Sequence, residues 1–116
     1  AGADLRSANL QRANLQGATL TEADLTGANL AEANLQQSNG SLANLQQTNL
    51  TGARLQRANL SGVQLTKATL RRADLKQASL LFADLQDATL IQADLRQAEL
   101  HGANLLGADL TNAAGP

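Results

Sequence analysis

The 116-residue chain contains no cysteine, methionine, tryptophan or tyrosine, and Phe82 is its one phenylalanine. Without cysteine it has no disulfide, no thiolate nucleophile and no cysteine-based metal site. No stretch has the length and apolarity of a membrane span or of a signal-peptide core, so we expect no membrane partner. The compartment stays open: the cytoplasm, or the periplasm or thylakoid lumen if a leader was removed.

The chain is also poor in catalytic groups, because His101 is its one histidine. A metal site needs several convergent ligands, and a serine-type triad needs a nucleophile beside an oriented base. Glu99 and Ser79 are expected near His101, but stacking in a ladder is the favoured interpretation. The glycines do not form a phosphate-binding loop. We therefore predict no enzyme activity, no catalytic residues, no cofactor and no metal.

Two residue types dominate the chain and recur every five residues. Leucine occupies 21 of the 22 positions 5, 10, 15 and onward to 110, and alanine occupies 19 of the 22 positions two residues earlier. An α-helix would spread these leucines around its surface, and a straight strand would send successive leucines to opposite faces. The period instead favours a short extended piece followed by a corner, repeated so that the chain forms a coil.

Glycine is frequent two residues after the leucine, which is the third position of a turn that opens at the leucine. A type II turn requires positive φ at that position and favours glycine. Other corners carry Arg, Glu, Gln or Lys there, and for these another turn type stays open. The corner glycines are Gly17, Gly27, Gly52, Gly62, Gly102 and Gly107.

Units such as ADLRS (3–7), ANLQR (8–12) and ADLTG (23–27) resemble the pentapeptide-repeat family, many of whose members come from cyanobacteria and have no known role. The resemblance implies an all-β fold, a right-handed quadrilateral parallel β-helix with four pentapeptides per coil. Residues 3–112 would form one domain of about 5.5 coils, and residues 113–116 a C-terminal tail. Residues 20 apart would then stack in columns on adjacent coils.

The position before each leucine is usually Asn or Asp. Such side chains bond to nearby backbone at turns, so we predict that they support the turns and form no active site. The fifteen residues are Asp4, Asn9, Asn14, Asp24, Asn29, Asn34, Asn39, Asn44, Asn49, Asn59, Asp74, Asp84, Asp94, Asn104 and Asp109.

Charge is banded along the chain: residues 51–76 carry a net charge of +5, the residues before them −2 and those after them −4. A solvated surface is one interpretation, and binding of an anionic protein is the functional one. Nucleic acid is disfavoured because no aromatic residues accompany the cations. A small apolar patch adds a second candidate surface. The possible partner-binding residues are Arg54, Arg57, Arg71, Arg72, Lys76, Leu81 and Phe82.

We predict a non-catalytic structural or protein-interaction solenoid whose protein partner is unknown, with end-to-end homo-oligomers possible through exposed coil edges. The alternative comes from the family resemblance, since some members imitate DNA, bind DNA gyrase and confer quinolone resistance. DNA mimicry requires a continuous negative surface. The outward charges on the four sides that contain Leu5, Leu10, Leu15 and Leu20 are instead −2, +1, +2 and −2.

The repeat has one irregularity, because Gly40 stands where leucine is expected and a leucine follows two residues later, at Leu42. The spacing from Leu35 to Leu45 is intact, so no insertion is present. We expect Leu42 to turn toward the gap. Three inward residues that replace alanine nearby are expected to fill part of it: Ser38, Thr48 and Val63.

Overall fold

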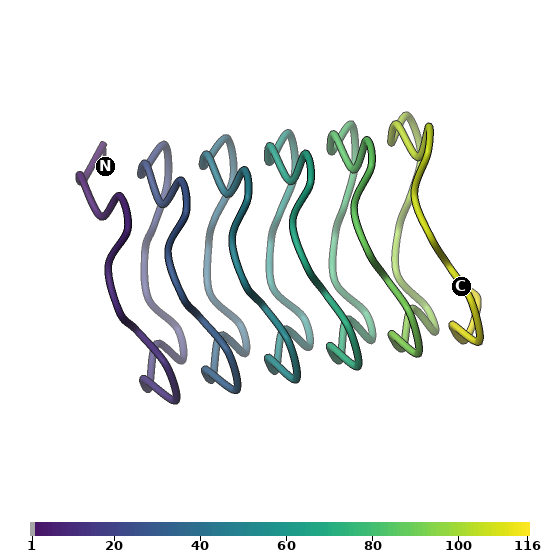
Figure 1. The fold of residues 1–116 in the computed structure, drawn as a ribbon, viewed down its shortest axis with the longest axis horizontal. Helices are drawn as coiled ribbons and strands as arrows, with labels where there is room; N and C mark the ends of the chain where they lie inside the picture. The colour runs from purple at the N-terminus through teal and green to yellow at the C-terminus, as the bar shows by residue number, and fades with distance from the viewer. Residues whose placement is uncertain (1) are drawn as a thin grey trace.

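The chain winds as a coil that repeats every 20 residues (Figure 1) in a computed structural model, which describes residues 2–116. Nineteen parallel bridges join a residue to the one 20 positions later, from Asp4–Asp24 to Asp94–Ala114. The molecule measures 31 × 24 × 23 Å. Residues 2–116 contain no helix, and the paired stretches are single bridged residues rather than longer strands. The described part of the chain thus has no helix that could cross a membrane.

Five complete coils and part of a sixth can be assigned from the bridges. They are coil 1 (3–22), coil 2 (23–42), coil 3 (43–62), coil 4 (63–82), coil 5 (83–102) and the partial coil 6 (103–114). Each complete coil has four sides, which we number 1 to 4 in chain order. Sides 1 to 4 of the first coil contain Leu5, Leu10, Leu15 and Leu20. The last bridge joins Asp94 to Ala114.

Every corner has the same turn. The leucine carbonyl accepts a hydrogen bond from the N–H three residues later, as between Leu5 and Ala8 at 3.1 Å. The third turn residue has positive φ at all 22 corners from Ser7 to Asn112, and sixteen of these residues are not glycine. The alternative of a different turn type at the non-glycine corners is therefore excluded. From Ser7 to Gln92 the cause is long-range: the N–H of this residue also bonds to the next coil, as from Ser7 at 2.9 Å, and this pairing favours one geometry.

The inter-coil bonds leave one N–H per pentapeptide without a backbone acceptor. In residues 23–27, the N–H groups of Ala23, Asp24, Leu25 and Gly27 all donate to backbone carbonyls. The remaining N–H, that of Thr26, donates to the side chain of Asp24 at 3.1 Å. An Asn or Asp before the leucine therefore completes the hydrogen bonding of its own unit, as buried or crowded backbone groups require.

All fifteen predicted Asn and Asp side chains accept this bond from the N–H two residues later, so the prediction of turn support is confirmed. The distances lie between 3.0 and 3.2 Å. The side-chain oxygen acts locally, within one unit. Either Asn or Asp can supply it, which explains why both occur in the same columns.

Leucine and alanine point inward from all four sides and form one apolar core. Leu65, Leu75 and Leu85 are fully buried in the middle coils. Toward the last coil the core is more accessible, and Leu110 is 39% exposed. Because inward positions repeat identically, the core is a set of leucine columns separated by small alanines.

The structure contradicts the expectation for Leu42. This residue occupies a corner with φ of 60° and its side chain is 60% exposed, so it does not fill the gap at Gly40. The backbone of Gly40 keeps the bonds of a leucine position, donating to Asn59 at 2.8 Å. A cavity of about 20 Å³ remains, and Ser38 lines it whereas Thr48 and Val63 do not. Register is set by backbone pairing, which fixes Leu42 as an outward corner residue.

Candidate protein-binding surface

Five of the predicted binding residues lie on side 3 and its two edges. Arg54 is on side 3 itself, and the backbone of Arg54 bridges to Asp74 on the next coil. Arg71 and Arg72 form the corner that leads into side 3 of coil 4, and Lys76 and Arg57 lie at corners that leave side 3. Register therefore brings together cations that are up to 22 residues apart in the sequence. We call Arg54, Arg57, Arg71 and Arg72 the side-3 arginines.

Leu81 and Phe82 lie elsewhere, at the corner between side 4 and side 1. Within one coil this corner is two turns from that of Arg71 and Arg72, so the two pairs lie at opposite corners. Phe82 is 66% exposed and its side chain covers Gly102 on the next coil. The predicted residues thus form two separate surfaces.

His101 contacts Phe82. The two ring centroids are 5.8 Å apart and the rings meet edge to face at 80°. The backbones of Ser79 and Glu99 are bridged in the neighbouring column. Among residues 2–116, no group of three or more potential His, Cys, Asp or Glu ligands converges.

Ion pairing distinguishes the side-3 arginines and Lys67 from the other cations. Arg6 pairs with Asp4 at 2.9 Å, Arg12 with Glu32 at 3.9 Å and Arg96 with Asp94 at 2.6 Å. Lys76 pairs with Asp74 at 3.5 Å. Within residues 2–116, the cations with no carboxylate oxygen within 4.0 Å are Arg54, Arg57, Lys67, Arg71 and Arg72. All five belong to the basic band, so its positive charge is not neutralised locally.

Two paired carboxylates remain ionised well into acid. The guanidinium of Arg96 donates to Asp94 and holds the pKa of that carboxyl at about 2. Arg6 does the same for Asp4, whose pKa is also about 2. Both pairs are exposed, so they neutralise charge locally rather than create a reactive group.

A groove runs along the corner between side 3 and side 4. Its volume is about 390 Å³, and we call it the amide groove because glutamines form most of its lining. Its lining residues are Gln16, Gln36, Gln37, Gln56, Arg57, Lys76, Gln77 and Gln97. The sequence signal for it is glutamine one or two residues after the leucine, repeated at intervals of 20, and it becomes visible only when the columns are assigned.

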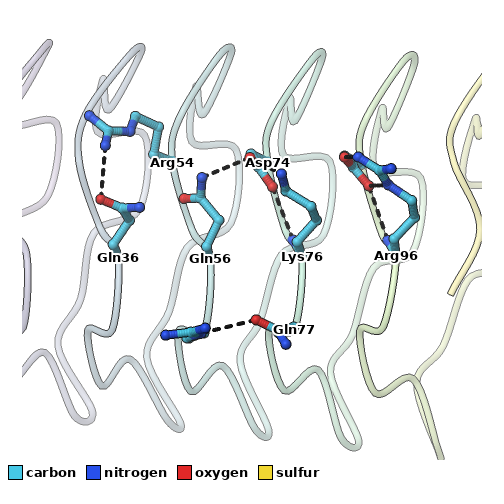
Figure 2. Close-up of polar contacts among 9 residues, drawn as sticks. Gln36, Arg54, Gln56, Asp74, Lys76, Gln77 and Arg96 are labelled. Carbon is cyan, nitrogen blue, oxygen red and sulfur yellow. Dashed lines mark hydrogen bonds and ion pairs between the residues drawn. The ribbon is translucent and has the colours of Figure 1, made fainter.

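Hydrogen bonds hold the groove side chains in place (Figure 2). Arg54 donates to Gln36 at 2.9 Å and Arg57 donates to Gln77 at 2.9 Å, each from one coil to a neighbouring one. The Gln56 amide N–H₂ donates to Asp74 at 2.7 Å. The opposite end of this amide, Oε1, is shielded from solvent and accepts no hydrogen bond from the described residues.

The family model for pentapeptide repeats matches residues 1–39, 41–77 and 78–113, in eight copies. The chain belongs to the pentapeptide-repeat family. Residue 40, which falls between two matched segments, is the glycine that replaces a leucine. Proteins of this family are generally structural or interaction proteins. No curated protein matches the chain.

Solved structures of family members have the same fold. The chain matches the pentapeptide-repeat protein Rfr23 from the cyanobacterium Cyanothece 51142 with a TM-score of 0.87 and 29% identity, over 99% of this chain and 89% of Rfr23. It matches alr5209 from Nostoc PCC 7120 with a TM-score of 0.54 and 37% identity, over 82% of this chain and 62% of that protein.

A match to QnrB1, a plasmid-mediated fluoroquinolone resistance protein, has a TM-score of 0.54 and 18% identity, over 86% of this chain and 58% of QnrB1. This similarity shows a shared fold alone. The chain spans less than two thirds of alr5209 and of QnrB1.

Proposed function

We propose that the protein is a non-catalytic interaction solenoid that binds an acidic surface of another protein through side 3. The observation that supports this proposal is the set of side-3 arginines, which lie on side 3 or at its edges and have no carboxylate partner within residues 2–116. Unpaired guanidinium groups are pre-organised donors for carboxylates and can bind them with two hydrogen bonds. An acidic partner supplies the missing charge.

The proposed scaffold is the right-handed quadrilateral parallel β-helix of the family. Four identical turns in each 20-residue coil and parallel bridges between successive coils support it. Such a solenoid holds its outward columns at a fixed spacing, about 4.8 Å from one coil to the next. A rigid surface of this kind loses little entropy when a partner binds.

The alternative function is DNA mimicry, with gyrase as the target. It requires negative charge along a continuous surface, whereas the four sides carry −2, +1, +2 and −2. Four of the five unpaired cations, the side-3 arginines, lie on side 3 or at its edges. The likeness to QnrB1 concerns the fold and carries no charge pattern to this chain. Addition of the protein to a gyrase supercoiling assay is therefore expected to leave supercoiling unchanged at micromolar concentration.

Quantitative affinity capture tests the proposal. The protein and two variants are immobilised and exposed to the same cell extract at two salt concentrations. One variant replaces all four side-3 arginines with glutamine, and the other is Leu81→Ser/Phe82→Ser. We expect the first variant to lose the proteins that wild type retains, the second to keep them, and retention to weaken at higher salt. Loss in the second variant alone would move the interface to the opposite corner and refute the proposal.

A further inference from the structure

We propose that the amide groove binds an extended acidic segment of a polypeptide, lying parallel to the axis of the coil. This rests on the proposed function and specifies the form of the partner. A folded acidic surface would contact the side-3 arginines broadly, whereas an extended segment would enter the groove between two columns of side chains.

The groove has the length for such a segment. Its lining runs from Gln16 in coil 1 to Gln97 in coil 5. Four coil steps of about 4.8 Å give roughly 19 Å, which about six residues of extended chain span. A second cavity lies at its C-terminal end and shares Lys76 and Gln97 with it. The path along the corner is therefore continuous over several coils.

The lining also has the chemistry for a polypeptide. Six of its eight residues are glutamines, the other two are Arg57 and Lys76, and no carboxylate is among them. A primary amide both donates and accepts hydrogen bonds, so it suits the N–H and C=O groups of a peptide. Arg57 suits a carboxylate, and Lys76, which pairs with Asp74 at 3.5 Å, adds a second cation to the groove. Arg57 donates from its Nε to Gln77 and makes no ion pair within the described residues, which leaves its terminal N–H groups for a ligand.

The Oε1 atom of Gln56 favours a ligand that carries hydrogen-bond donors. This oxygen is shielded from solvent and accepts no bond from residues 2–116. A buried acceptor without a donor is unfavourable, so reordering of the groove side chains around an incoming N–H stabilises the complex. Peptides supply such donors along their whole length, whereas phosphate groups at neutral pH supply few. The shielding predicts that the Gln56 side chain moves when the segment binds.

Single-stranded nucleic acid fits the groove less well. Proteins that bind single strands stack bases on aromatic side chains. The lining contains no aromatic residue, and Phe82 lies at a different corner, between side 4 and side 1. The groove therefore selects for a chain whose backbone, rather than its bases, makes the contacts.

The test uses the whole 116-residue protein and an unlabelled synthetic peptide of alternating Glu and Gly, with oligo-dT of similar charge as the comparison. Binding is followed by calorimetry and by the side-chain amide signals of glutamine in ¹H–¹⁵N NMR spectra. We expect the peptide to shift the signals of Gln36, Gln56 and Gln77 and to bind more tightly than oligo-dT. Tighter binding of oligo-dT would overturn the choice of a polypeptide.

Two charge-matched variants separate the groove from general attraction. Arg57→Gln/Lys76→Gln removes two charges from the groove and is expected to weaken peptide binding about tenfold. Arg71→Gln/Arg72→Gln removes two charges outside it and is expected to weaken binding less than about threefold. Equal weakening in both variants, or no binding to wild type, would overturn the groove. Circular dichroism first confirms that each variant is folded.

A third variant, Gln36→Ala/Gln77→Ala, changes no charge and removes two amides of the lining. It should weaken binding of the Glu-Gly peptide, and unchanged affinity would refute the role of the amides. The proposed function is tested separately. If the peptide does not bind in the groove but capture from extract still requires the side-3 arginines, the interaction function is retained and the extended acidic segment is rejected.

Discussion

A Cβ atom built on Gly40 lies 3.1 Å from Cδ2 of Leu60, the next residue in the same core column. The Leu60 side chain therefore borders the space that a leucine at position 40 would occupy, and a cavity of about 20 Å³ is left beside it. The missing leucine is partly compensated within its own column. The exposed Leu42 takes no part.

Gly40→Ala is expected to stabilise the protein by about 0.5–1 kcal/mol. Gly40 is not among the residues with positive φ, so alanine fits its backbone, and the one close neighbour is the flexible end of a side chain. The measurement is the free energy of unfolding in urea. Leu42→Ala is the control and should cost less than about 1 kcal/mol because the side chain is exposed. A cost above about 2 kcal/mol would show that Leu42 does fill the gap.

Asn44→Ala should destabilise the protein by about 1 kcal/mol. It removes the side-chain oxygen that accepts the N–H of Gln46 at 3.1 Å, and no backbone carbonyl replaces it. Urea unfolding gives the energy, and hydrogen exchange at the Gln46 amide should become faster. Asn44→Asp keeps the oxygen and should retain most of the stability. Equal losses in both variants would argue that the amide group, and not the turn bond, is what matters.

Gly62→Ala is expected to cost about 2 kcal/mol, from two separable sources. Gly62 has φ of 67°, and an added Cβ would lie 2.8 Å from Cδ2 of Leu42. In a Leu42→Ala background the contact disappears but the backbone strain remains, so the same change should cost about 1 kcal/mol. A double-mutant cycle in urea measures the difference. A cost that is the same in both backgrounds would mean that Leu42 rotates away freely.

Acid should weaken the structure through Asp94. Its pKa is lowered from 3.8 to about 2 by the hydrogen bond from Arg96, so its contribution to stability is complete above pH 3.8 and is lost as the pH falls through about 2. Asp94→Asn keeps an oxygen for the Arg96 N–H but removes the charge. We expect the stability difference between wild type and this variant to shrink from pH 4 to pH 2 in thermal unfolding.

The control repeats Asp94→Asn in an Arg96→Gln background, which removes the guanidinium that donates to Asp94. The stability difference caused by Asp94→Asn should change less between pH 4 and pH 2 in that background. If the pH dependence is the same in both backgrounds, general charge repulsion and not the Arg96 bond governs it.

The sequence predicts those features that repeat within one pentapeptide. The inward leucine and alanine, the corner after each leucine and the bond made by residues such as Asn44 all follow from a five-residue pattern. The turn at Gln77 does not follow from the local pattern. Its φ of 61° is one that residues other than glycine rarely adopt, and backbone pairing between coils imposes it. The expected inward turn of Leu42 was wrong for the same reason, since backbone pairing overrides the preference of one apolar side chain.

The amide groove is harder to predict from the sequence than the corners are. Gln36, Gln56 and Gln77 become neighbours through the 20-residue coil, and their hydrogen bonds depend on rotamers that no local pattern encodes. The division of the predicted binding residues into two surfaces likewise becomes visible only when each corner is assigned to a side of the coil. The sequence identifies residues that could contribute to a binding surface, and the coil determines which of them become neighbours.

The bond that an Asn or Asp before the leucine accepts from the N–H two residues later has a wider consequence for how the sequence of such a chain can change. At the fifteen corners that have this bond, one position completes the hydrogen bonding of the unit, and the side chains of the two residues after the leucine are not required for it. Substitutions there can alter what the surface recognises without disturbing the frame. Successive coils therefore present outward side chains about 4.8 Å apart, and the binding properties of the surface can change by one substitution at a time.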